Sequence, residues 1–365
     1  MVSNMLKTSL EVLKIIEKRG YECYIVGGFV RDYYMNKEAF DVDICTNAKP
    51  KDLLEIFSNA SLPKEKYGAV TLFYKSIRYE ITTFRKELTY ENRKPIEIEY
   101  TDNFKEDISR RDFYVNTLCM NSNGDIIDLL DGKKDIDNKI IRVVGDPNKK
   151  FNEDPLRILR AIRFATQLNF SLDESVVLNI KNNAELLRTL SYQRKMGELN
   201  KIFVNKNVKY GLDLLKRLEV DKYLDLYGLD NIKITTNVLG FWSQLDINNL
   251  YLYSSLDLKS IQSIREIIRL NKITKREVYV YGLYVCSIVA EILGVSKKYV
   301  TKLEKSLSIH SIKDINITSD EILNILNKEP GNWLRELYKD IEYKIVDSKL
   351  KNNNNEIKKY IMNNY

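Results

Sequence analysis

The spacing of apolar and polar positions changes near residue 140. Before that point, short apolar runs with a period of two lie between turn residues, a pattern that predicts β-strands. These runs are CYIVGG, FDVDIC, AVTLFY, RYEITTF and IEIEYT, followed by NSNGDIIDL, expected to be a hairpin with Asn123 and Gly124 at its tip. After residue 140, apolar residues recur at helical spacing and strand patterns nearly vanish. The predicted fold class is α+β, an N-terminal head with a mixed or antiparallel sheet followed by an all-helical remainder.

Three other segments have patterns that bear on membranes and loops. Residues 1–20 combine helically spaced apolar positions with charges, which predicts an amphipathic helix rather than a signal peptide. The apolar run 278–295 contains Glu291 and is rich in Tyr, so we expect a buried helix and no membrane span. The tract KNNNN at 351–355 is expected to be a polar loop before a final helix.

Composition narrows the function only slightly. The 365 residues include 58 Lys and Arg against 51 Asp and Glu, a formal charge of +7, which mildly favours a polyanionic partner. The four cysteines lie far apart without a C-x-x-C pair, and His310 is the only histidine, so zinc sites and histidine-based triads lack their ligands. Reduced cysteines and a cytoplasmic location are the simplest interpretation.

The first candidate site is the stretch IVGGFVRDYYM from residue 25 onward. Gly27 and Gly28 follow a short buried strand and form a turn where the backbone can approach a ligand closely. A helix then begins, and its free N–H groups together with Arg31 in its first turn suit a phosphate. A plain strand-turn-helix corner is the alternative, because such glycine turns are common.

The second candidate follows ten residues after Arg31. In FDVDI the strand period puts Asp41 and Asp43 on one face, with Phe40, Val42 and Ile44 toward the core. Two carboxylates ~7 Å apart along a strand can converge on divalent cations. Two solvated acids on the protein surface would give the same sequence pattern. Their position beside a phosphate-binding turn favours the cation-binding interpretation, because enzymes of nucleotidyl transfer place a pair of metal ions beside a bound triphosphate.

A third candidate is the helix expected after Asp154 and Pro155, which form a good cap and first-turn pair. Its three arginines, Arg157, Arg160 and Arg163, fall within an arc of about 120°, while apolar residues cover the opposite side. No acids are interspersed among the arginines, as they would be on a solvated salt-bridge face. The arginines are therefore expected to meet an anion.

Gly27-Gly28-x-x-Arg31-Asp32 followed by Asp41-x-Asp43 resembles the nucleotidyltransferase signature of the polymerase-beta superfamily. In this form it is similar to the class II tRNA nucleotidyltransferase and bacterial poly(A) polymerase family. Later segments carry the same resemblance, although Tyr114, Thr117 and Gln193 differ from the residues that the family motifs have at these positions. These segments are RRDFYVNTL (110–118), NEDPLRILRAIRF (152–164), SYQRKMGEL (191–199) and a C-terminal stretch similar to the tail of bacterial CCA-adding enzymes. The resemblance covers nearly the whole chain.

The resemblance implies specific roles for the motif residues. Asp154 and Arg157 would read the Watson–Crick edge of the incoming base, accepting C and A and rejecting G and U. A carboxylate and a guanidinium together supply the acceptors and donors that this edge needs. The remaining nucleotide-binding residues would be Arg111 at the triphosphate, Asp112 at the ribose hydroxyl, Asn116 in the same motif, and Arg160 and Arg163 at phosphate or sugar.

The implied activity is addition of C, C and A to the 3′ end of tRNA from CTP and ATP, without a nucleic-acid template. Two Mg²⁺ ions at Asp41 and Asp43 would support attack of the RNA 3′-hydroxyl on the α-phosphate and departure of pyrophosphate. Glu80, on a neighbouring strand, is either a third acid near the metals or an ordinary solvent-facing residue. Basic helices, including RLNKITKRE and SKKYVTKLEK, would bind the acceptor arm of tRNA. No protein partner is implied.

The charged segment 85–95 bears on how many nucleotides are added. It resembles the flexible loop of full CCA-adding enzymes, and Glu91 and Arg93 favour addition of all three nucleotides; a mobile hairpin tip is the alternative. A poly(A) polymerase, a partial CC- or A-adding enzyme and a catalytically silent RNA-binding protein remain as other functions. The domains expected from the resemblance are a catalytic head, a base-recognition neck, a body and a tRNA-binding tail, at 1–138, 139–204, 205–295 and 296–365.

Overall fold

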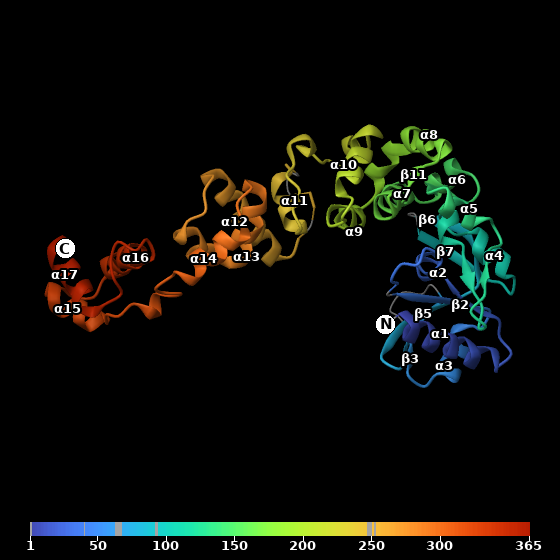
Figure 1. The fold of residues 1–365 in the computed structure, drawn as a ribbon, viewed down its shortest axis with the longest axis horizontal. Helices are drawn as coiled ribbons and strands as arrows, with labels where there is room; N and C mark the ends of the chain where they lie inside the picture. The colour runs from blue at the N-terminus through green and yellow to red at the C-terminus, as the bar shows by residue number, and fades with distance from the viewer. Residues whose placement is uncertain (1, 40, 63–67, 92–93, 247–249, 252) are drawn as a thin grey trace. The chain divides into compact units, whose positions relative to one another are not determined.

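The computed structural model describes residues 2–39, 41–62, 68–91, 94–246, 250–251 and 253–365. The chain divides into two units, residues 1–225 and 226–365, each with its own core (Figure 1). The first unit carries the sheet and the second is helical, which confirms the α+β class. The division into four domains remains a prediction.

A seven-stranded mixed sheet organises the first unit. Its order is β3-β4-β5-β2-β1-β8-β9, and β2 and β5 are its parallel pair. The strands are β1 (Cys23–Val26), β2 (Val42–Thr46), β3 (Ala60–Ser61), β4 (Ala69–Tyr74), β5 (Ile77–Thr83), β8 (Cys119–Met120) and β9 (Ile126–Ile127). The predicted hairpin around Asn123 and Gly124 joins β8 to β9, with Gly124 at φ 88°.

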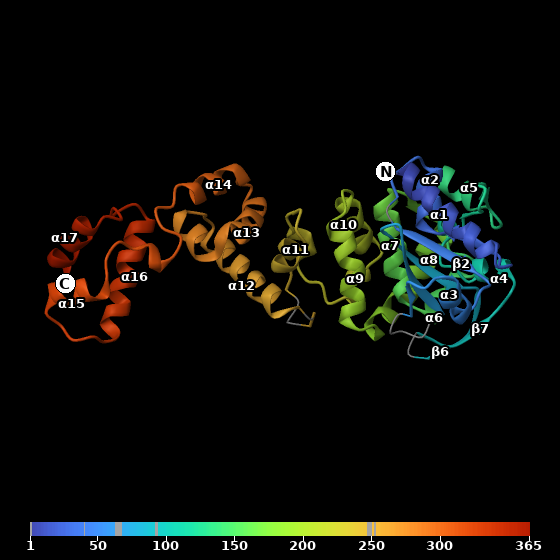
Figure 2. The same cartoon turned by 90° about the horizontal axis from the view of Figure 1, so that it is seen from below.

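The two faces of the sheet are covered differently. Helices α1 (Val2–Glu17) and α3 (Pro50–Ile56) lie side by side against one face, and Leu13 and Ile16 of α1 are fully buried there (Figures 1 and 2). On the other face, Phe104 of α4 (Phe104–Ser109) stacks on Tyr24 of β1, with ring centroids 4.0 Å apart. In β2, Ile44 is buried and Asp43 is exposed, as the period of two predicts. Phe40 lies outside the described residues.

The segment 85–95 is a hairpin rather than a loop. Its strands β6 (Arg85–Glu91) and β7 (Lys94–Tyr100) pair antiparallel and form a separate two-stranded sheet. The expected loop was therefore too long. The run of charged residues Arg85–Glu87 hides the strand in the sequence, and the pairing register shifts between Glu87 and Thr89. Arg93 lies outside the described residues, so the role expected for Glu91 and Arg93 remains a prediction.

Further helices complete the first unit. They are α2 (Gly28–Tyr34), α5 (Gly132–Asp137), α6 (Pro147–Glu153), α7 (Leu156–Leu168), α8 (Glu174–Asn183), α9 (Tyr192–Phe203) and α10 (Val208–Arg217), with α2 directly after β1. The strand pair β10 (Ile140–Ile141) and β11 (Ser171–Leu172) is parallel. On α7, Ile158, Leu159 and Ile162 are fully buried, which confirms the apolar side predicted for this helix.

The second unit consists of helices. They are α11 (Val238–Gln244), α12 (Ser255–Leu270), α13 (Lys275–Leu293), α14 (Lys297–Lys305), α15 (Ser319–Leu326), α16 (Asn332–Val346) and α17 (Asn354–Asn364). The run 278–295 does lie mostly in a helix, α13, but the prediction that it is buried was wrong for one side: Val280 and Tyr284 are 47% and 57% exposed. The polar loop before α17 ends at Asn353, which caps the helix, so it is shorter than predicted. No helix in the described part of the chain is long and apolar enough to cross a membrane.

Candidate active site

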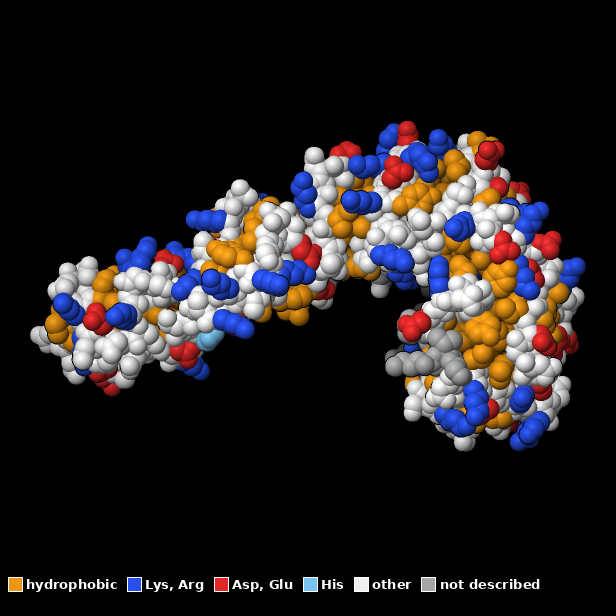
Figure 3. Space-filling model, viewed as in Figure 1, with side chains coloured by type: hydrophobic (Ala, Val, Ile, Leu, Met, Phe, Trp, Pro, Cys, Tyr) orange, Lys and Arg blue, Asp and Glu red, His pale blue; other side chains and the backbone are white. Residues whose placement is uncertain are grey.

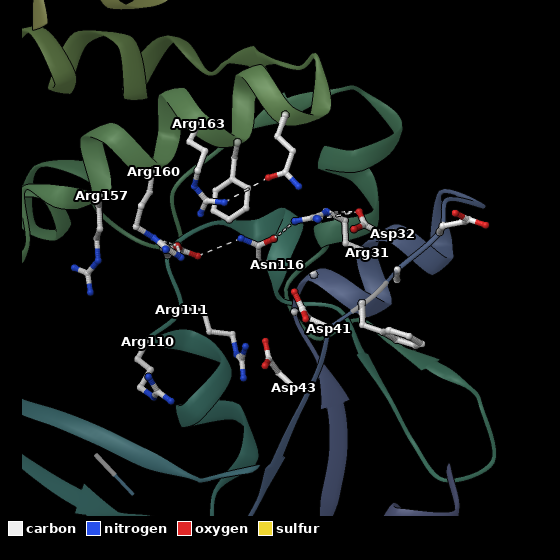
Figure 4. A pocket seen from close by; sticks show the side chains of 18 residues that line it. Arg31, Asp32, Asp41, Asp43, Arg110, Arg111, Asn116, Arg157, Arg160 and Arg163 are labelled. Atoms are coloured by element: carbon white, nitrogen blue, oxygen red, sulfur yellow. Dashed lines mark hydrogen bonds and ion pairs between the residues drawn. The ribbon is translucent and has the colours of Figure 1, made fainter. Parts of the chain in front are cut away.

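A cavity of about 580 Å³ in the first unit gathers most of the predicted site residues (Figure 4). Side chains from β2, α2, α7 and the segment after α4 line it. The predicted residues that line it are Gly27, Gly28, Arg31, Asp41, Asp43, Arg111, Asp112, Asn116, Arg157, Arg160 and Arg163. Glu80 and Asp154 are not among the lining residues.

The acid pair, Asp41 and Asp43, points into this cavity from the start of β2 (Figure 4). Both side chains are exposed, and among the described residues neither carboxylate has a hydrogen bond or an ion pair. Although Asp43 is open to the cavity, the protein atoms around its carboxylate exclude much of the water, and this desolvation, followed by the negative charge of Glu80, raises the pKa of Asp43 to about 6. Arg111 opposes this rise, and Asp41 adds to it. The pair therefore carries unbalanced negative charge.

Glu80 lies beside the acid pair but outside the cavity lining. Strand β5 runs parallel to β2 with Glu80 paired in register with Asp43, so the predicted neighbouring strand is confirmed. Its side chain is exposed. Glu80 therefore acts on the site through its charge, which raises the pKa of Asp43.

The glycine turn needs glycine because of its backbone conformation. Gly27 has φ 76° and ψ −135°, a conformation that disfavours residues with a Cβ. A Cβ at Gly27 would also lie 3.8 Å from Nη1 of Arg111 and 3.9 Å from Oδ2 of Asp43. The turn therefore brings the backbone close to one cation and one anion of the site.

Arg31 is held rather than free. Only 2% of the residue is exposed, and its Nη1 donates to Oδ1 of Asn116 at 2.7 Å while its Nε donates to Oδ1 of Asp32 at 2.9 Å. The expectation of a side chain projecting from the first turn is therefore wrong in part. Arg31 lines the cavity with its charge already shared with Asp32.

Hydrogen bonds of Asp112 and Asn116 link α7 to the segment that precedes β8. Nε of Arg160 donates to Oδ2 of Asp112 at 2.8 Å, and Nδ2 of Asn116 donates to Oδ1 at 3.3 Å. Burial alone would raise the pKa of Asp112, but the charge and hydrogen bonds of Arg160 leave it below its usual value. With the bond from Arg31 to Asn116, this forms a continuous polar chain from Arg160 to Asp32.

The arginine face, Arg157, Arg160 and Arg163, projects from α7 into the cavity (Figure 4). Each arginine is paired with a carboxylate: Arg157 with Glu153 at 2.8 Å, Arg160 with Asp112, and Arg163 with Glu198 at 2.5 Å. The helix itself has no acids among its arginines, as the sequence indicates, and the three carboxylate partners come from outside α7. Burial, opposed by Glu198, lowers the pKa of Arg163.

Asp154 lies just before α7 and serves as a cap. Its Oδ1 accepts a hydrogen bond from the backbone N–H of Leu156 at 3.1 Å, as the capping interpretation predicts. Its carboxylate also pairs with Nη2 of Arg194, on α9, at 2.8 Å. Arg194 thus fixes the side chain that is expected to read the base.

Sequence reasoning missed several residues at this site. Phe164 lies among the arginines, with its ring centroid 3.9 Å from Cζ of Arg163 and 5.5 Å from that of Arg160. Its spacing, four residues after Arg160, would have indicated the same side of the helix. Arg110 also lines the cavity, and its place beside Arg111 in the RRDF motif was the available signal.

Comparisons with known proteins identify relatives over the whole length. The model of the poly A polymerase head domain matches residues 23–142, that of the "Probable RNA and SrmB- binding site of polymerase A" matches 169–224, and that of tRNA nucleotidyltransferase domain 2 matches 251–361. The CCA-adding enzyme of Enterococcus faecalis is 33% identical over 96% of this chain and 94% of its own length. That of Staphylococcus saprophyticus is 31% identical over 99% of both chains.

A solved structure agrees with these relatives. The crystal structure of the Bacillus stearothermophilus CCA-adding enzyme in complex with CTP superposes with a TM-score of 0.86 at 25% sequence identity. The match covers 98% of this chain and 96% of that chain. The similarity therefore extends through both units.

Proposed function

This chain belongs to the CCA-adding enzyme family, and from that premise we propose that it adds C, C and A to the 3′ end of tRNA from CTP and ATP. The observation that carries the proposal is the single cavity shared by the acid pair, the glycine turn and the arginine face. Phosphoryl chemistry needs cation ligands and positively charged groups around one reacting phosphate. This cavity contains both kinds of group.

The acid pair is proposed to hold Mg²⁺. Carboxylate oxygens are preferred Mg²⁺ ligands, and the raised pKa of Asp43 means that a nearby cation would favour its ionised form. The described residues include no cluster of three or more His, Cys, Asp and Glu side chains arranged for a metal. Water and nucleotide phosphates would therefore supply the other ligands. Bound Mg²⁺ supplies Lewis-acid activation of the attacking hydroxyl and neutralises phosphate charge.

Arg111 and the glycine turn are proposed to bind the triphosphate. Arg111 points toward Asp43 beside Gly27, so its guanidinium faces the space in which a phosphate beside the acid pair would bind (Figure 4). Backbone N–H groups at the turn add donors without a side chain in the way. Arg31 and Asn116, which are hydrogen-bonded to each other, form the cavity wall next to Arg111 and the glycine turn. Asp112 is proposed to bind the ribose hydroxyl.

Asp154 and Arg157 are proposed to select the base. Arg157 also donates to the carbonyl of Lys150 at 2.9 Å, and with its pairing to Glu153 this fixes the direction of its guanidinium. Asp154 is fixed in the same way by Arg194. A pre-positioned donor and acceptor pair discriminates among base edges better than a mobile one. Arg160 and Arg163 are proposed to meet phosphate or sugar.

The second unit is proposed to bind the acceptor arm of tRNA. Its helix α14 exposes Lys297, Lys298, Lys302 and Lys305, and Figure 3 shows Lys and Arg side chains gathered over α13 and α14 on the visible face. Such contacts release counterions from the RNA, so the affinity for tRNA should fall steeply as salt rises from about 50 to 200 mM. A flat salt response in a filter-binding assay would contradict this part of the proposal.

The test of function is nucleotide addition to tRNA that lacks its 3′ end. We expect two additions with CTP alone, three with CTP and ATP together, and pyrophosphate release in both cases. Long A tails would instead indicate a poly(A) polymerase, the function for which the matched head-domain model is named. Arrest after two additions with both nucleotides would indicate a partial enzyme, and absence of pyrophosphate release would indicate a silent RNA-binding protein. The cytoplasmic location remains a prediction.

A further inference from the structure

Asp107, on α4, is a charged side chain without exposed surface, and neither the motifs nor the roles proposed above use it. Its Oδ1 accepts hydrogen bonds from Nε and Nη2 of Arg110 at 3.0 and 2.7 Å. Its Oδ2 accepts one from Nη2 of Arg111 at 3.3 Å. One buried carboxylate thus contacts two guanidinium groups, and both arginines line the cavity.

Arg111 depends on this carboxylate for its position. In the described part of the chain, the bond to Asp107 is the only hydrogen bond that the Arg111 guanidinium makes, and its Nε is buried without a partner. Its other terminal nitrogen, Nη1, faces the position of Gly27 and Asp43. One end of the guanidinium is therefore held by Asp107 and the other is presented to the proposed phosphate site.

Helix α4 is itself fixed against the sheet that bears the acid pair. Phe104 and Ile108 are buried in a cluster with Val26 and Cys45, from β1 and β2. The carboxylate of Asp107 therefore has a defined position relative to Asp43. Oδ1 of Asp107 also accepts from the backbone N–H of Arg85 at 3.3 Å, at the first residue of the β6–β7 hairpin. The base of the hairpin and the two arginines therefore share one carboxylate, Oδ1 for Arg85 and Arg110 and Oδ2 for Arg111.

The charges explain why a carboxylate suits this position. A buried guanidinium without a counter-ion is costly, and Asp107 supplies that counter-ion through Oδ1 for Arg110 and through Oδ2 for Arg111. Two arginines against one aspartate leave a net positive charge, directed at the cavity. We propose that Asp107 is a positioning residue for nucleotide transfer, which holds Arg111 and Arg110 toward the triphosphate. This inference rests on the role proposed above for Arg111.

The alternative is that Asp107 only stabilises the fold, and Asp135 provides a matched control. Asp135 is 4% exposed and accepts hydrogen bonds from Nε and Nη2 of Arg142, but neither residue lines the cavity. Asp135→Asn removes the same charge from a similar buried pair. It should change stability without changing the chemistry.

The experiment compares Asp107→Asn, Arg111→Ala, the double variant and Asp135→Asn in steady-state addition of CMP and of AMP, with melting temperatures recorded for each. We expect Asp107→Asn to lower kcat on the order of 10- to 100-fold for both nucleotides, because the guanidinium loses its alignment. KM should change less than kcat. The loss of kcat in the double variant should be smaller than the product of the two single losses, because without the Arg111 guanidinium Asp107 can act only through Arg110. Asp135→Asn should keep the kcat of the unaltered protein.

Two outcomes overturn the inference. One is an unchanged kcat in folded Asp107→Asn, and the other is an additive loss in the double variant, which would place the effect away from Arg111. If Asp107→Asn does not fold, Asp107→Glu decides, because it keeps the charge while displacing the carboxylate by one methylene; unaltered kcat there also overturns the inference. An unaffected Arg111→Ala would refute the role proposed for Arg111 itself, and inactivity of the unaltered protein would refute the proposed function.

Discussion

The acid pair and the arginine face line one cavity but differ in how the protein completes them. Each arginine has a carboxylate partner within the fold, whereas Asp41 and Asp43 have no hydrogen bond or ion pair among the residues that the structure describes. The arginine face is pre-organised before any ligand arrives. The acid pair instead carries uncompensated charge, which a cation would balance. The contrast indicates that the proposed base and sugar contacts are already positioned by the fold, whereas the proposed metal site would be completed only by the ion and the nucleotide.

Removal of an acid should have the largest effect. Asp43→Asn deletes a proposed Mg²⁺ ligand, so single-turnover addition should slow by roughly three orders of magnitude, equivalent to several kcal/mol of lost charge stabilisation. The affinity for tRNA, measured by filter binding, should not change. Asp125→Asn, at a hairpin turn between β8 and β9, is the control. Near-normal turnover by Asp43→Asn would contradict the proposed metal site.

Removal of a base-reading arginine should change selectivity more than rate. Arg157→Ala deletes a proposed bidentate donor, so the preference for C and A over G and U should shrink by roughly 10- to 100-fold, from the 1–3 kcal/mol of one such contact. Metal-dependent transfer should persist. The measurement is kcat/KM for all four nucleotides, with Arg217→Ala, on α10, as a control distant in sequence. An unchanged preference would refute the template role.

A smaller effect tests whether the arginine face is pre-organised by its acids. Glu153→Gln keeps a hydrogen-bond acceptor for Arg157 but removes the charge of an i, i+4 pair. We expect KM for CTP and ATP to rise about three-fold while kcat stays the same. The Arg157 side chain would be less ordered in the free protein, so the entropy lost on ordering it would be paid when the nucleotide binds. A large loss of kcat would instead show that Glu153 takes part in transfer.

The acid pair should also affect stability in a pH-dependent way. Since the pKa of Asp43 is raised to about 6 in the folded protein, ionisation of Asp43 opposes folding. The stability that it contributes is fully present below the pKa of an unfolded aspartate and is lost as the pH rises through about 6. In EDTA, Asp43→Asn should therefore melt close to the unaltered protein at about pH 3.5, below the pKa of an unfolded aspartate, and above it at pH 7.5. Glu80→Gln should reduce this difference, and equal melting temperatures at both pH values would contradict the raised pKa.

Local patterns in the sequence predict much of this site, because they depend on the period of one element. The strand period placed Asp43 opposite the buried Ile44, and the helical period placed three arginines on one side of α7. The partners of those arginines could not be predicted in the same way. Glu198 follows Arg163 by 35 residues and Asp112 precedes Arg160 by 48, so both contacts depend on tertiary packing. Likewise, nothing in the spacing of EDISRRDF distinguishes the buried Asp107 from its half-exposed neighbour Glu106.

The most direct test of the central claim is the affinity of Mn²⁺, used as a spectroscopic substitute for Mg²⁺, measured by electron paramagnetic resonance in the presence of CTP. The unaltered protein should bind Mn²⁺, and Asp41→Asn and Asp43→Asn should each bind it at least about ten-fold more weakly, since each loses a charged ligand. Glu153→Gln should bind it as the unaltered protein does. Equal Mn²⁺ affinity in all four proteins would contradict the claim that the acid pair holds the metal.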